Sequence, residues 1–344
     1  MQHANNGTGI HQRLQHPVEE NLISEPLDLN RARSIDDLVR AMAKTAFTGR
    51  QIGEAADVLE AMARDKDCFV VMTLAGAITL AKQDLIISEL IDRGIVNAIV
   101  STGELMAHGF IEATERNPGV LQEVISETLE SWDHNDVLCS YKLNHAIGAH
   151  LSRHSKDQRG ILKSAYEKGV PVFVPAFTDS ELGLEVALNI RLRESTGRHK
   201  LRFDPFEDLE HFSATLLRQT RLGIFTIGGG VPLNWSQQFG PFVDLRRRRL
   251  GENLPMKRYH YCVNICPERV LVGESSTSLL SESKFVPASE GGKFVEVFVH
   301  ATVGIPLILA AVLERLGKNK NGTAKTGLAK TADKTTKAKA AARK

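Results

Sequence analysis

The chain has 344 residues, of which 42% are hydrophobic and 24% charged, and its formal net charge is +2. This length provides for a sizeable core in one large α/β domain or two small ones. The sequence has no apolar run of about 18 residues, and its N-terminus lacks the apolar segment of a secretory signal. We therefore expect no membrane span and a cytoplasmic protein.

Four cysteines are present, and most of them lie in or beside apolar runs, which is typical of buried thiols. Cys262 and Cys266 have no second Cys/His pair at zinc-binding spacing. The sequence therefore predicts no metal site and no disulfide framework.

The two ends of the chain differ from the rest in composition. Residues 1–30 are polar and predicted to form a flexible arm, and residues 317–344 a disordered basic tail. A Lys/Ala-rich tail attracts polyanions, so weak contact with nucleic acid is one interpretation, and a solubilising appendage is the other. Without the tail the chain is acidic, which argues against a fold that reads nucleic acid. Residues 31–316 are then one folded domain.

Hydrophobic periodicity predicts alternating helices and strands from residue 34 onward. Two helices are expected between Ser34, a candidate N-cap, and about Arg64. Apolar runs predict strands at 68–74, 95–100, 170–177, 223–227, 259–265 and 294–301. Helices are expected between most of them, near 85–94, 161–168, 182–194, 205–220, 234–248 and 305–316. This alternation predicts an α/β fold with a mostly parallel sheet and helices on both faces.

Ligands of such sheets bind at the carboxyl ends of the strands. That rule selects the loops at 73–79, 101–104, 178–183 and 228–231. The most informative of them is Gly228-Gly229-Gly230, between an apolar strand and a helix. Glycines let the backbone approach a ligand and direct N–H groups to phosphate, although a tight turn explains them equally well. Gly76 and Gly103, which also follow strands, favour a nucleotide site at this edge.

Two polar residues are ambiguous from local sequence alone. Asp179 is expected at the same edge, where a carboxylate accepts hydrogen bonds from a ribose or binds a cationic substrate. It is equally suited to be the N-cap of the helix that follows. Lys284 has the local sequence of an ordinary loop lysine.

A series of segments resembles one known family over about residues 30–316. The segments are Thr45-Ala46-Phe47 with Gln51-Ile52-Gly53, Leu74-Ala75-Gly76-Ala77, Val100-Ser101-Thr102-Gly103, Pro171 to Asp179, Gly228 to Pro232, Val297 to Thr302, and Pro306-Leu307. In this order they resemble deoxyhypusine synthase and its bacterial relatives.

The resemblance implies a Rossmann-like parallel sheet, a homotetramer and NAD sites at subunit interfaces. It also implies a reaction in which NAD accepts a hydride from spermidine, diaminopropane leaves, and a lysine captures the remaining four-carbon imine. An acceptor amine then displaces the lysine, and NADH returns the hydride. The lysine must be neutral to attack, so its pKa should be lowered by burial or by nearby positive charge.

The resemblance also implies which residues bind and react. Lys284 matches the catalytic lysine, since it stands about a dozen residues before Val297 to Thr302 and its nearest competitor, Lys293, fits less well. The positions that match the NAD-contacting loops are Gly76, Ala77, Thr102, Gly103, Asp179, Gly228, Gly229 and Gly230.

Several family residues are replaced here. The tryptophan and glycine before the lysine are Glu282 and Ser283, the histidine after the triple glycine is Asn234, and an aspartate expected after Gly183 is Leu184. Two main hypotheses follow. The chain is an NAD-dependent aminoalkyl transferase for spermidine or a related amine such as putrescine or agmatine. The alternative is a catalytically silent relative that binds a nucleotide or another subunit.

Overall fold

The computed structural model describes residues 24–75, 78–106, 118–130, 132, 137–154, 159–267 and 284–318. Gly76, Ala77, Glu282 and Ser283 lie outside these residues, as do most of the predicted arm and nearly all of the predicted tail. Within the described part of the chain, no helix is both long enough and apolar enough to cross a bilayer.

The centre of the fold is a six-stranded sheet in which every pair of neighbouring strands is parallel. Its order is β4-β2-β1-β6-β7-β8. The strands are β1 (Cys68–Leu74), β2 (Ala98–Ser101), β4 (Val172–Phe173), β6 (Arg221–Ile227), β7 (Tyr259–Ile265) and β8 (Lys293–Val297). The predicted α/β class with a parallel sheet is confirmed.

Helices cover both faces of this sheet, because its strands are apolar on both sides. Along β1, Val70, Met72 and Leu74 belong to one buried cluster, whereas Val71 belongs to another. The first cluster contains buried residues of α1 (Ile35–Ala43), α2 (Phe47–Arg64), α3 (Asp84–Asp92), α5 (Pro118–Glu130), α6 (Ser140–His154), α7 (Ile161–Lys168), α8 (Glu181–Ser195) and α12 (Ala301–Lys318). The second contains residues of α9 (Phe206–Leu217), α10 (Gly230–Gln237) and α11 (Phe239–Leu250).

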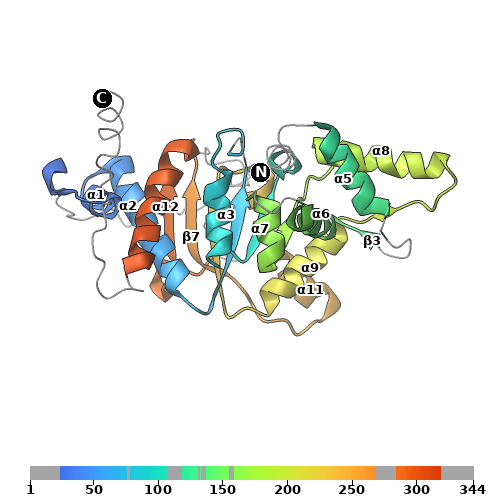
Figure 1. Cartoon of the computed structure of the whole chain (residues 1–344). Coiled ribbons are helices and arrows are strands. Elements are labelled where there is room, and N and C mark those ends of the chain that lie inside the picture. Colours follow the sequence, from blue (N-terminus) through green and yellow to red (C-terminus); the bar gives the residue numbers. More distant parts are fainter. Residues whose placement is uncertain are drawn as a thin grey trace, which may run out of the picture.

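The helices are spread along the sheet from one end to the other. Figure 1 shows α1, α2 and α12 together at one end of the molecule, and α5 and α8 at the opposite end. At the first end, the buried guanidinium of Arg315 on α12 joins Asp36 of α1 at 2.5 Å and Asp57 of α2 at 2.7 Å. Ser34 caps α1 as predicted, because its side chain accepts a hydrogen bond from Asp37 N.

The structure corrects several predicted boundaries. β4 has two residues rather than the eight predicted, since Pro171 and Pro175 flank it and proline cannot donate to a sheet. The predicted helix 234–248 is two helices, α10 and α11, because the ring of Pro241 would clash with a carbonyl of a continuous helix. Residue 301, predicted to end a strand, begins α12.

Some elements were not predicted at all. α5 and α6 were missed, and so was a small second sheet in which β3 (Val137–Leu138) pairs with β5 (Arg202–Phe203). Strands of two residues are too short to produce a detectable hydrophobic alternation.

Candidate nucleotide and lysine site

The candidate site lies at the topological switch point of the sheet, where the chain stops adding strands on one side of β1 and begins adding them on the other. If the six strands of the sheet are numbered along the chain, their order is 3-2-1-4-5-6, so β1 and β6 are neighbours from which the chain proceeds to opposite edges. In α/β sheets the crevice outside the carboxyl ends of such a strand pair is the usual ligand site. The loops that begin at Ala75 and Gly228 lie at this point.

The two loops touch each other through their backbones. Ala75 N donates to Ile227 O at 2.9 Å, and Gly228 N donates to Ile265 O at 2.9 Å. Gly228 has φ +81°, and a Cβ added there would lie 2.9 Å from Ala75 O. A side chain at position 228 is therefore excluded by both backbone conformation and space.

The space beside Gly229 and Gly230 in the same loop is unoccupied by protein atoms. A Cβ added at either position would meet nothing within 4 Å, so space remains above the backbone. Gly229 is the N-cap residue of α10, whose first N–H groups lack partners within the helix. Open space over a helix N-terminus suits a phosphate, so these glycines fit the pyrophosphate of a dinucleotide.

Thr102 and Gly103 follow β2 and lie against the loop after β4. A Cβ on Gly103 would collide with the side chain of Ser180. Ser180 is the N-cap of α8, because its hydroxyl accepts from Gly183 N at 3.1 Å. The predicted capping role of Asp179 therefore belongs to its neighbour. Asp179 itself is exposed at the same edge as Thr102.

Lys284 lies beside Tyr259, the first residue of β7, and therefore at the end of that strand away from the carboxyl edge. Its carbonyl oxygen accepts from Tyr259 N at 2.9 Å, and Val286 N donates to Tyr259 O at 2.9 Å. The Lys284 side chain reaches α10, where Nζ donates to Gln237 Oε1 at 3.2 Å. Burial lowers the pKa of this amine from the ordinary lysine value. The competitor, Lys293, is exposed at the start of β8.

α10 links the glycine loop to the lysine. It begins at Gly230 and ends at Gln237, and seven residues at about 1.5 Å each separate the two by about 10 Å. Tyr259 fixes the second end of the helix, because its hydroxyl donates to Ser236 O at 3.1 Å. The structure thus brings Lys284 to the same helix as the glycines, although not to the carboxyl edge itself.

Gln237 is a residue that sequence reasoning missed. Its side chain is 1% exposed, and Nε2 has no hydrogen-bond partner among the described residues. The only signal in the sequence was a run of amides, Asn234, Gln237 and Gln238, directly after the glycine loop. Since neither Asn234 nor Gln238 is buried, the sequence could not indicate which amide faces the lysine.

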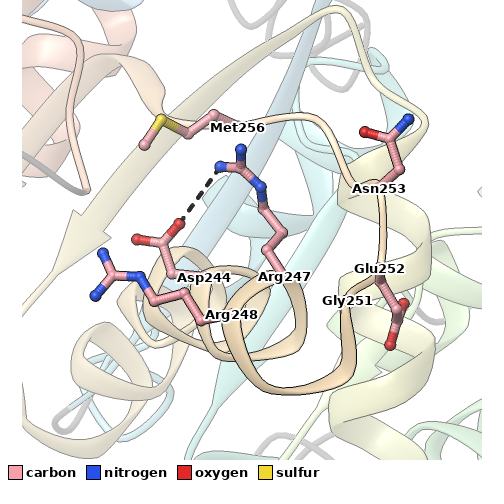
Figure 2. Close-up of a pocket in the computed structure, with 7 residues that line it drawn as sticks. All are labelled: Asp244, Arg247, Arg248, Gly251, Glu252, Asn253 and Met256. Carbon is pink, nitrogen blue, oxygen red and sulfur yellow. Dashed lines mark ion pairs between the residues drawn. The ribbon is translucent and has the colours of Figure 1, made fainter.

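A surface hollow at the end of α11 is lined by none of the predicted site residues. Figure 2 shows Arg247 paired with Asp244 one turn earlier on the same helix, with Glu252 and Met256 on the following loop. The ion pair has a length of 3.8 Å. Arg246 pairs with Glu252 at 2.6 Å. These arginines end α11, where positive charge interacts favourably with the helix dipole.

Cys68 and Cys139 are poor candidates for nucleophiles. Burial raises the pKa of the Cys68 and Cys139 thiols to about 12, which keeps both protonated. Over the ranges that the structure describes, no group of three or more His, Cys, Asp or Glu side chains is arranged to hold a metal.

The sheet order defines a doubly wound parallel α/β domain, with the glycine loop at its topological switch point. The sequence model of the deoxyhypusine synthase family matches residues 37–120 and 113–312, which is most of the chain. The chain belongs to the deoxyhypusine synthase family.

Individual relatives are distant. "Probable deoxyhypusine synthase 2" of Methanosarcina mazei is 27% identical, over 88% of this chain and 93% of its own length. A "Deoxyhypusine synthase-like protein" of Chlorobaculum parvum is 28% identical, over 79% of this chain and 84% of its own. A crystal structure of a protein provisionally described as a deoxyhypusine synthase, from Entamoeba histolytica, has a TM-score of 0.59 at 16% identity and covers 84% of this chain and 96% of that one.

Proposed function

We propose that the chain is an NAD-dependent aminoalkyl transferase that moves an aminobutyl group from spermidine, or from a related polyamine, through an imine on Lys284. The observation that carries this proposal is the environment of that lysine. Its amine is half-buried and hydrogen-bonded to Gln237, and burial lowers its pKa. A larger fraction of this amine is therefore neutral at cellular pH than of a surface lysine, and only the neutral amine is a nucleophile.

The cofactor would lie at the glycine loop. The N–H groups of Gly229 and Gly230 would bind its pyrophosphate, Gly228 would allow the close approach of the loops, and Asp179 and Thr102 would accept or donate hydrogen bonds at a ribose. Gly76, Ala77 and Gly103 complete the proposed cofactor loops. When bound, NAD supplies the acceptor for a hydride in the first half-reaction, and NADH supplies the hydride in the second.

Lys284 would carry the aminobutyl group between the two halves. Its neutral Nζ attacks the carbon of the four-carbon imine, the bond to diaminopropane breaks, and a new C=N bond joins the fragment to the lysine. Gln237 Oε1 accepts one N–H of the amine, which orients the lone pair without adding a charge that would favour the ammonium form. An acceptor amine then attacks the same carbon and releases the lysine.

The donor is expected to be weakly held if it is spermidine. Several family residues that would hold its ammonium groups are replaced, as by Leu184, and each charged hydrogen bond lost costs about 1.5–3 kcal/mol. We therefore include putrescine and agmatine among the candidate donors. A homotetramer in the cytoplasm is part of the same proposal.

The alternative is a catalytically silent member that binds a nucleotide or another subunit. The separation of about 10 Å between the glycine loop and Lys284, along α10, favours this alternative. The two proposals differ in whether a bound amine is consumed.

The test is to mix the protein with NAD and each amine and to measure NADH absorbance together with the released amine by chromatography. The transferase proposal predicts NADH and released amine in equal amounts, together with a borohydride-trapped adduct at position 284 that is lost in Lys284→Arg, whose guanidinium stays charged. NAD affinity, measured by calorimetry, should be unchanged in that variant. Binding of NAD with no amine consumed from any donor would support the silent member instead.

A further inference from the structure

A row of polar side chains crosses the sheet at the second-to-last residue of four neighbouring strands. In the register of the strands, Thr73 of β1 lies beside Thr226 of β6, and Thr226 lies beside Asn264 of β7. Asn264 in turn lies beside Glu296 of β8. Neighbouring strands are about 4.8 Å apart, so the row is about 14 Å long and runs just below the carboxyl edge.

The row points to the face of the sheet that packs against α9, α10 and α11. Ile224 and Cys262 belong to the buried cluster on that face. Thr226 and Asn264 follow them by two residues, and residues two apart on a strand point to the same face. Glu296 also points there, because burial first and the charge of Glu296 second raise the pKa of the Cys262 thiol.

The two ends of the row differ in how their polar atoms are satisfied. Thr73 Oγ1 donates to Thr226 Oγ1 at 2.9 Å, so the buried hydroxyls at one end bond to each other. Asn264 is 8% exposed, and its Oδ1 has no hydrogen-bond partner among the described residues. Leaving a buried acceptor unpaired is costly, and such an atom in a native protein is often paired with a ligand. Because the carboxylate of Glu296 is also an acceptor, a ligand that satisfies both side chains must be a hydrogen-bond donor.

We propose that Asn264 and Glu296 bind the terminal ammonium group of the amine donor, an inference that rests on the proposed function. An ammonium group has three N–H donors and a positive charge, which match an amide oxygen beside a carboxylate. A ribose hydroxyl would also donate to Asn264, but a neighbouring carboxylate attracts a cation more strongly than a neutral group. The row also supplies a carboxylate in a chain that has Leu184 at a position where an aspartate is expected.

The subsite is close to the glycine loop. Gly228 N donates to Ile265 O at 2.9 Å, and Ile265 directly follows Asn264. A cofactor at the loop would therefore lie beside an amine whose ammonium end is at Asn264. The rest of a linear donor would extend along the same face of the sheet toward Lys284, which lies nearer the amino edge and contacts α10.

The experiment measures the binding of spermidine, putrescine and agmatine to the full chain by calorimetry, with NAD present. For the amine that binds most tightly, Glu296→Gln and Asn264→Leu should each raise Kd at least tenfold, since each removes a hydrogen bond to a charged group. Glu290→Gln, at an exposed carboxylate just before β8, is the matched control and should keep the wild-type Kd. Circular dichroism and Tm establish that each variant is folded, and NAD affinity should be unchanged in all three.

Three results would overturn the subsite. These are an unchanged amine affinity in either Glu296→Gln or Asn264→Leu, a loss of NAD affinity in place of amine affinity, and a wild-type protein that binds none of the three amines. NADH formation on the same samples reports the transferase proposal separately. Amine binding that depends on Glu296 without NADH formation would support the subsite and contradict the transferase, whereas NADH formation unaffected by both substitutions would do the reverse.

Discussion

At the scale of single residues, the site depends on one hydrogen bond that has no signature in the sequence. Resemblance alone selected Lys284, and the structure gives that lysine a half-buried amine and a neutral acceptor, Gln237. The acceptor could not be predicted from sequence because Asn234, Gln237 and Gln238 all follow the glycine loop. It is the packing of α10 that buries Gln237 and leaves the other two amides at least partly exposed. The pKa of the lysine should therefore respond to the charge at position 237.

We expect Gln237→Glu to move the pH profile of Lys284 reactivity to higher pH. A carboxylate beside the amine favours the ammonium form, which raises the lysine pKa, and each unit lowers the neutral fraction at neutral pH about tenfold. The measurement is the rate of imine formation at Lys284 as a function of pH. Gln238→Glu, at the exposed neighbouring amide, should leave the profile in place. An unshifted profile in Gln237→Glu would show that the two side chains do not interact.

Substitutions in the glycine loop should affect the free energy of unfolding and the affinity for NAD to different extents. Gly229 has a negative φ of −159° and open space around its α-carbon, so Gly229→Ala should cost less stability than a substitution at Gly228. The added methyl group points to where a phosphate would lie, and NAD affinity should fall at least tenfold. Calorimetry and urea denaturation measure the two quantities.

Gly228→Ala is the contrasting variant, because its Cβ would meet the backbone of Ala75 at a positive φ. It should cost about 1–3 kcal/mol of stability. Equal stability losses in the two variants would contradict the assigned backbone roles.

At the scale of elements, α1, α2 and α12 meet around the buried guanidinium of Arg315. Arg315 is 3% exposed and contacts carboxylates on both α1 and α2, so it connects the last helix to the first two. The sequence predicted all three helices but not this connection, because their separation along the chain hides which charges meet. Two predicted elements were too long because their apolar pattern continues past a proline. These are the strand at 170–177, which contains Pro175, and the helix at 234–248, which contains Pro241.

Arg315→Met should lower the free energy of unfolding by about 1.5–3 kcal/mol, because the charged hydrogen bonds from Arg315 to Asp36 and Asp57 are lost while Arg40 still pairs with Asp36 at 3.0 Å. Urea denaturation measures this change. Arg31→Met removes an exposed pair with Asp28 and should leave the denaturation midpoint unchanged within error. A small effect at position 315 would mean that the three helices are held together by apolar packing alone.

At the scale of the whole molecule, the fold class followed from alternating helices and strands, whereas the order of the strands did not. Apolar runs show that β1 and β6 are buried but not that they are neighbours, since their pairing joins residues 68–74 to residues 221–227. That adjacency places Ala75 beside Gly228, and it is the part of the site that the sequence could not provide.

The measurement that tests the central claim most directly is reductive trapping on Lys284. The protein is incubated with NAD and, separately, spermidine, putrescine and agmatine, then treated with borohydride and mapped by peptide mass spectrometry. We predict a donor-derived adduct on Lys284 that requires NAD, persists in Lys293→Arg and disappears in Lys284→Arg. An adduct on another lysine, or no adduct with any amine in a protein that binds NAD, would contradict the account.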